Sequence, residues 1–69
     1  MAKEVLGYHV YSTAKGGVWL ADDEQSWTSN FIDSVEFGSP DLAADIGERE
    51  HARAFKGTGT IYVMACMGS

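Results

Sequence analysis

Few side chains in this sequence could hold a metal ion or activate a nucleophile. The two histidines and the single cysteine are His9, His51 and Cys66, and no two of them stand at a ligand spacing such as CxxC or HxxxH. No serine is flanked by the glycines of a nucleophile elbow, and the glycines at 15–17 and 57–59 lack the pattern of a phosphate loop. We therefore expect no metal site, no cofactor and no catalytic residue, and a protein that is not an enzyme.

Carboxylates are the other side chains in this sequence that could carry a function. The net charge is −5, and the stretch from Gly16 to Glu48 holds eight carboxylates but no lysine or arginine. Such a field repels nucleic-acid phosphates and anionic membranes and attracts basic protein surfaces. We predict a basic nucleic-acid-binding protein as the partner, with no direct binding of nucleic acid and no membrane contact. The predicted partner-binding residues are Asp22, Asp23, Glu24, Asp33, Glu36, Asp41, Asp45 and Glu48.

The eight aromatic residues are not expected to form a base-stacking platform, because single-strand binders combine such rings with a basic groove. Most of these rings should build the core. Trp27 follows an acidic loop and is either a core anchor or an interface anchor, since tryptophan is enriched at interfaces.

The length of 69 residues allows one hydrophobic core, so we expect a single domain over residues 1–69. One cysteine cannot form an internal disulfide, and in its apolar run Cys66 is typical of a small buried hydrophobe. This composition suits the reducing cytoplasm, and no apolar run approaches the roughly 20 residues that span a bilayer. We expect a cytoplasmic protein that is a monomer or a weak dimer.

The elements that must position these residues follow from local patterns. Alternation and β-branched or aromatic content predict strands over 4–12 and 18–21, joined by a glycine turn. A polar loop, a short helical turn and an extended link are expected over 22–26, 27–33 and 35–37. The last strand, 60–66, is apolar on both faces, which is typical of a central strand.

The main helix is predicted to begin at Ser39 and Pro40, a serine N-cap followed by proline at the first helical position. Gly47 leaves two alternatives open, because glycine weakens a helix by about 1 kcal/mol relative to alanine: the helix ends there or continues to about Ala54. Its spacing is amphipathic, with an apolar face of Leu42, Ala43 and Ile46 and an acidic face of Asp41, Asp45 and Glu48.

These elements predict an α+β fold. It consists of a small antiparallel β-sheet of three to four strands, with one main amphipathic helix packed on one face and a short extra helical turn.

The stretch YHVYSTAKGGVWLADDEQSWTSNFIDSVEFGSPDLAADI resembles a small domain that recurs in bacteriophages and mobile elements. The resemblance covers about two thirds of the chain and rests on short apolar motifs, which indicate a fold better than a function. Among phage proteins of this size and acidity, the chain looks like an anti-CRISPR protein that inhibits a type I system. The positions that carry the resemblance are Trp19, Trp27, Thr28, Phe31, Val35, Phe37, Ser39 and Leu42.

This resemblance implies a Cas effector subunit with a basic DNA-binding surface as the partner, in the cytoplasm of a bacterial host. The first hypothesis is therefore a non-catalytic inhibitor whose acidic, DNA-mimicking surface blocks that site. The alternative is a phage accessory or structural domain that self-associates through an apolar sheet face or edge.

Overall fold

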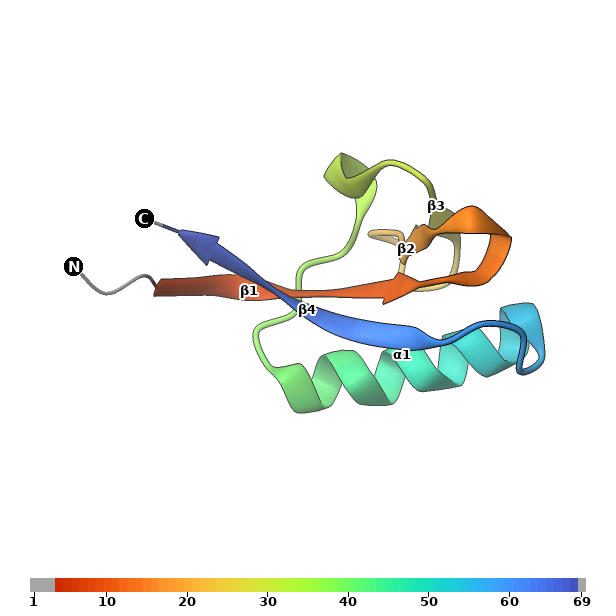
Figure 1. Cartoon of the computed structure of the whole chain (residues 1–69). Helices are drawn as coiled ribbons and strands as arrows, with labels where there is room; N and C mark the ends of the chain where they lie inside the picture. Colours follow the sequence, from red (N-terminus) through yellow and green to blue (C-terminus); the bar gives the residue numbers. More distant parts are fainter. Residues whose placement is uncertain (1–3, 69) are drawn as a thin grey trace.

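The computed structural model describes residues 4–68, which form an antiparallel sheet with one α-helix across one face (Figure 1). The strand order in the sheet is β3-β2-β1-β4. This arrangement confirms the predicted α+β fold class. The elements in chain order are β1 (Glu4–Ser12), the 3-10 turn η1 (Ala14–Gly16), β2 (Val18–Leu20), β3 (Trp27–Thr28), the 3-10 turn η2 (Phe31–Asp33), α1 (Pro40–Phe55) and β4 (Ile61–Gly68).

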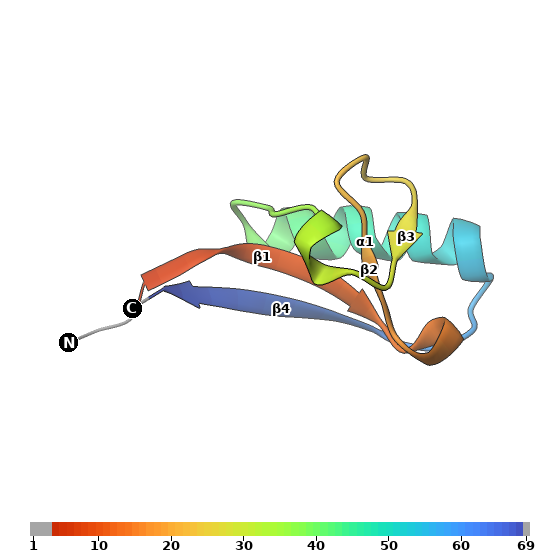
Figure 2. The same cartoon turned by 90° about the horizontal axis from the view of Figure 1, so that it is seen from above.

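The longest strand pairing joins β1 to β4, from Glu4 opposite Gly68 to Ser12 opposite Ile61. The expectation of a central position for the last strand was wrong, because β4 lies at the edge of the sheet (Figure 2). The two faces of β4 have different surroundings. One face packs against α1, while the other face and the outer edge of β4 have no partner strand among residues 4–68.

Local capping explains the ends of α1. The Ser39 hydroxyl accepts a hydrogen bond from the Leu42 N–H at 3.4 Å, and Lys56 closes the helix in a left-handed conformation with φ 51°. The helix runs through Gly47 to Phe55, which settles the alternatives in favour of the longer helix. No helix within residues 4–68 is long and apolar enough to cross a membrane.

Gly47 lies where α1 crosses β1. A Cβ atom at this position would stand 2.8 Å from Cγ1 of Val10 and 3.0 Å from its Cγ2, so glycine allows the helix to approach the strand. The buried stripe of α1 therefore centres on Ala43 and Gly47 and continues to His51. The prediction that Leu42 belongs to the apolar face was wrong. Leu42 precedes Ala43 in the helix and lies beside the buried stripe, so its side chain is 48% exposed.

The core lies between α1 and the sheet. Val10, Leu20, Phe37 and Ala43 are buried there, and partly buried apolar side chains from β1, β4 and α1 surround them. This layer uses only one face of the sheet, because successive side chains of a strand point to opposite faces.

The segment 27–33 was predicted as one helical turn, but it divides into β3 and η2. Trp27 and Thr28 pair with Leu20 and Trp19, and the helical geometry begins only after Asn30, whose side chain accepts a hydrogen bond from the Ile32 N–H. The Trp27 ring packs against the rings of His51 and Phe55 with centroid separations of 5.7 and 5.2 Å. These contacts give Trp27 the role of a core anchor.

Candidate functional site

The uncovered face of the sheet is the first candidate surface. In Figure 1, α1 covers one side of the sheet, whereas η2 and the segments that lead into and out of it lie on the other side. Because Val10 and Ser12 face the helix, His9 and Tyr11 of β1 point to the uncovered side. The pairing places Tyr62 opposite Tyr11 and Met64 opposite His9, and the two β4 side chains are 51% and 47% exposed.

An aromatic cluster organises this face around Trp19. Its ring centroid lies 4.8 Å from that of Tyr11 and 4.8 Å from that of Phe31, both in edge-on geometry. Phe31 reaches the sheet from η2 and also lies 4.6 Å from the ring of His9. Gly17, at φ 112°, leaves room for Tyr11, since a Cβ atom would collide with the tyrosine hydroxyl. The uncovered face therefore has an aromatic cluster around Trp19 and, along β4, the exposed side chains of Tyr62 and Met64.

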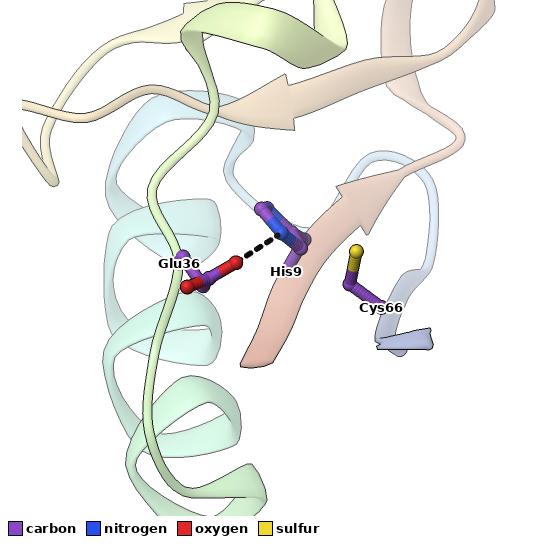
Figure 3. Close-up of side chains that lie close together, drawn as sticks. All are labelled: His9, Glu36 and Cys66. Carbon is purple, nitrogen blue, oxygen red and sulfur yellow. Dashed lines mark ion pairs between the residues drawn. The ribbon is translucent and has the colours of Figure 1, made fainter. Parts of the chain in front are cut away.

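A second feature of this face is a cluster of three potential metal ligands, His9, Glu36 and Cys66 (Figure 3). One donor atom from each lies within 4.8 Å of the other two, and Nε2 of His9 is 3.7 Å from Oε2 of Glu36. His9 is buried, Cys66 is partly buried and Glu36 is exposed. The prediction that Cys66 is a buried hydrophobe therefore holds only in part, because its thiol belongs to this polar cluster.

Three separate segments deliver these side chains. His9 comes from β1, Cys66 from β4, and Glu36 from the extended link that runs beside β1, where the N–H groups of Tyr8 and Phe37 donate to each other's carbonyl oxygens at 2.8 Å. Gly7 stands opposite Cys66, beside an irregularity in the strand pairing. Any side chain at Gly7 would occupy the place of the Glu36 side chain, whose Cδ would lie 2.6 Å from a Cβ atom.

Sequence reasoning missed this cluster because its members lie far apart in the chain. Glu36 is 27 positions after His9 and Cys66 is 30 positions after Glu36, so no short motif relates them. The available signal was Gly7, since a lone glycine inside a strand often marks a bulge or a close approach of another segment.

A buried serine and histidine also meet, but not on the uncovered face. Nε2 of His51 lies 2.9 Å from Oγ of Ser12, between α1 and β1. Ser12 is fully buried, and its hydroxyl oxygen also accepts the Ala14 N–H at 3.0 Å. A substrate has no access to such a hydroxyl, so the pair acts as a polar link inside the core.

All eight predicted partner-binding carboxylates are exposed, and they fall into three segments. Asp22, Asp23 and Glu24 occupy the loop after β2, where the Asp22 N–H donates to the Asp33 carbonyl oxygen at 2.9 Å. Asp33 ends the turn η2, and Glu36 in the link that follows belongs to the cluster with His9. The helix carries the remaining three acids on its solvent side, as predicted: Asp41, Asp45 and Glu48.

Asp23 has a structural role in its loop. Its carboxylate accepts hydrogen bonds from the Ser26 hydroxyl at 2.6 Å, the Ser26 N–H at 2.7 Å and the Gln25 N–H at 2.9 Å. These bonds lower the pKa of Asp23 below its ordinary value of 3.8, and the bond from the Ser26 hydroxyl has the largest effect. Asp23 is thus a turn-forming residue as well as a surface charge.

Comparison with protein-family models, with curated proteins and with solved structures finds no match to this chain.

Proposed function

We propose that the chain is a non-catalytic protein-binding domain, and that a second copy of the chain binds along the edge strand β4 and the adjoining uncovered sheet face. The observation that carries this proposal is the chemistry of β4. Eight consecutive residues form an edge strand without a single charge, and Tyr62, Met64 and Met67 on it are about half exposed.

Edge strands of monomeric proteins are usually protected by lysine, proline or a covering segment, because their unpaired N–H and C=O groups can pair with another chain. Lysine and proline are absent from β4, and within residues 4–68 no segment covers its outer edge. The paired ends of β1 and β4 also extend past α1, as Figures 1 and 2 both show, and Val5 and Leu6 are exposed on this extension.

A second copy fits this surface better than a basic partner does. Residues 57–69 contain no charged side chain, whereas the carboxylates lie between Asp22 and Glu50 apart from Glu4. Two copies can therefore approach along β4 although each has a net charge of −5. Antiparallel pairing of two β4 strands would be isologous, with the same patch contributed by each copy, and would extend the sheet across the dimer.

The test is the mass of the chain in solution as a function of concentration, measured by sedimentation with a chelator present. We expect a dimer that dissociates on dilution and persists or strengthens at high salt, because salt screens the repulsion between acidic copies. Tyr62→Lys and Met64→Lys should shift the equilibrium to monomer, since each places a charge on the contact surface. Leu42→Lys is the matched control, an equally exposed apolar residue on α1.

A parent chain that stays monomeric at every concentration would overturn the proposal. So would a dimer that Leu42→Lys weakens as much as Met64→Lys does.

A second candidate function is inhibition of a basic nucleic-acid-binding protein by the acidic surface. It is favoured by the eight exposed carboxylates, none of which pairs with a lysine or arginine within residues 4–68. The resemblance to anti-CRISPR proteins adds a Cas effector subunit of a type I system as the candidate partner. In this function the carboxylates occupy positions that DNA phosphates would take on the effector.

Competition with duplex DNA for a purified type I effector complex tests this second function. The chain should displace DNA from the complex, lose affinity steeply as salt rises, and not bind DNA itself. Displacement that is insensitive to salt, or direct binding to DNA, would contradict it.

A further inference from the structure

We propose that His9, Glu36 and Cys66 form a binding site for a divalent transition-metal ion, and that Zn²⁺ is the ion best matched to it. Imidazole nitrogen, carboxylate oxygen and thiolate sulfur are the three ligand types that proteins use for zinc. All three occur once in this cluster, with donor atoms within 4.8 Å of one another.

One of the three separations matches that between two ligands of a bound ion, and all three ligand atoms lie within 4.8 Å of one another. Zinc lies about 2.0 to 2.3 Å from its ligand atoms in a tetrahedral site, which places neighbouring ligand atoms roughly 3.3 to 3.8 Å apart. The 3.7 Å between His9 Nε2 and Glu36 Oε2 already falls in this range. Glu36 is the exposed member, so its carboxylate can adjust to the ion without disturbing the core.

The hydrogen bonds of His9 prepare its ring for coordination. The Ser34 hydroxyl donates to the Phe31 carbonyl oxygen at 2.6 Å, so its oxygen is left to accept the Nδ1–H of His9 at 2.8 Å. This arrangement keeps the proton on Nδ1 and the lone pair on Nε2, the nitrogen that faces Glu36. A ring N–H held by an outer hydrogen bond is the usual arrangement of a metal-binding histidine.

Binding would be coupled to release of one proton. The Cys66 thiol loses its proton to solvent as sulfur bonds to the ion, because the thiolate is the form of cysteine that binds a metal. The two negative ligands then balance the charge of Zn²⁺. Three protein ligands leave a fourth position, which water or a group from another molecule can fill.

The competing explanation is an ion pair between protonated His9 and Glu36, with Cys66 as a neighbour that binds nothing. The two explanations differ in the part played by sulfur. An ion pair makes the thiol irrelevant to metal binding, whereas the metal site requires it.

Titration of the full chain with Zn²⁺ alone, after treatment with a chelator and in the presence of a phosphine reductant, tests the site. We expect one ion per chain by calorimetry and release of one proton. Co²⁺ in place of Zn²⁺ should give the near-ultraviolet absorption band of a cobalt–thiolate bond.

Variants separate this site from metal binding by surface carboxylates. Cys66→Ser should abolish the cobalt–thiolate band, and Glu36→Gln should weaken Zn²⁺ binding at least tenfold. Asp45→Asn, an exposed carboxylate on α1, is the matched control and should bind like the parent. Ser34→Ala retains all three ligands but removes the bond to Nδ1, and should weaken binding roughly 10- to 100-fold.

Circular dichroism of each variant verifies that it is folded. His9→Gln is not used as the deciding variant, because His9 is buried and its replacement can unfold the protein. The proposal is overturned if the parent binds no Zn²⁺ saturably. It is also overturned if Cys66→Ser binds with the parent's affinity, because the exposed carboxylates would then account for the binding.

Discussion

Nε2 of His51 on α1 lies 2.9 Å from the Ser12 hydroxyl oxygen on β1, and both side chains are buried. The same oxygen accepts the Ala14 N–H at 3.0 Å, so one hydroxyl joins the helix, the end of the strand and the turn η1. Buried polar groups stabilise a fold only when they are paired, and the loss of one partner leaves the other without hydrogen bonds.

Ser12→Ala should therefore destabilise the protein by about 1 to 3 kcal/mol, because it leaves His51 Nε2 and the Ala14 N–H without their partner. For a domain of this size, each kcal/mol lowers the thermal midpoint by about 4 to 8 °C. Ser29→Ala is the control, since Ser29 is exposed. Equal thermal midpoints for the two variants would show that the buried link contributes nothing.

Gly47→Ala should also destabilise, although alanine is the better helix former by about 1 kcal/mol. The new methyl group would stand 2.8 Å from Val10 Cγ1, and Val10 is fully buried with a β-branched side chain that cannot turn aside. Overpacking of this kind costs about 1 to 3 kcal/mol. Urea denaturation should show a loss for Gly47→Ala and none for Gly38→Ala, where no atom lies within 4 Å of the added carbon.

A double-mutant cycle with Val10→Ala identifies the cause of that loss. If the clash is responsible, Gly47→Ala should be less harmful in the Val10→Ala background, because the valine methyl groups are gone. A loss of the same size in both backgrounds would contradict the close approach of α1 to β1.

Asp23 should titrate below its ordinary pKa of 3.8, because the Ser26 hydroxyl and two backbone N–H groups donate to its ionised form. A depressed folded-state pKa means that the stabilising contribution is present above about pH 3.8 and is lost as the pH falls through the depressed pKa. Ser26→Ala should raise the pKa, measured by NMR titration of the carboxyl carbon. An identical pKa in this variant would show that the hydroxyl bond does not form in solution.

Reversal of the helix charges separates the two functions proposed above. Asp45→Lys combined with Glu48→Lys should leave the thermal midpoint nearly unchanged, because both side chains are exposed. The variant should lose competition with DNA for a type I effector if the acidic surface binds it, but should dimerise like the parent. Unchanged competition by the folded variant would exclude the acidic row on α1 from the binding surface.

The loop needs a more careful version of the same test. Asp22→Lys is suitable because the hydrogen bond of Asp22 to Asp33 uses its backbone N–H and not its side chain. Asp23→Lys is unsuitable because it would remove three hydrogen bonds from the turn and confuse a folding defect with a binding defect.

Local signals predicted local elements well. The serine cap and the following proline located the start of α1, and alternation in 4–12 matched β1. Errors arose where long-range pairing outweighed local preference: β3 formed at Trp27 because β2 lay beside it, and Leu42 became exposed because Gly47 set the rotation of the helix.

By itself the sequence determined the fold class, the glycine turn after the first strand, the exposed acids of α1 and the uncharged last strand, because each depends on neighbours within a few residues. Only the tertiary structure decided that β4 lies at the edge of the sheet and that one sheet face is uncovered, since strand order depends on contacts between distant segments. The same reason holds for the cluster of His9, Glu36 and Cys66. These three residues are distant in the sequence, and they become neighbours because β4 returns along β1 and the link that holds Glu36 pairs beside β1, with the Glu36 side chain over Gly7.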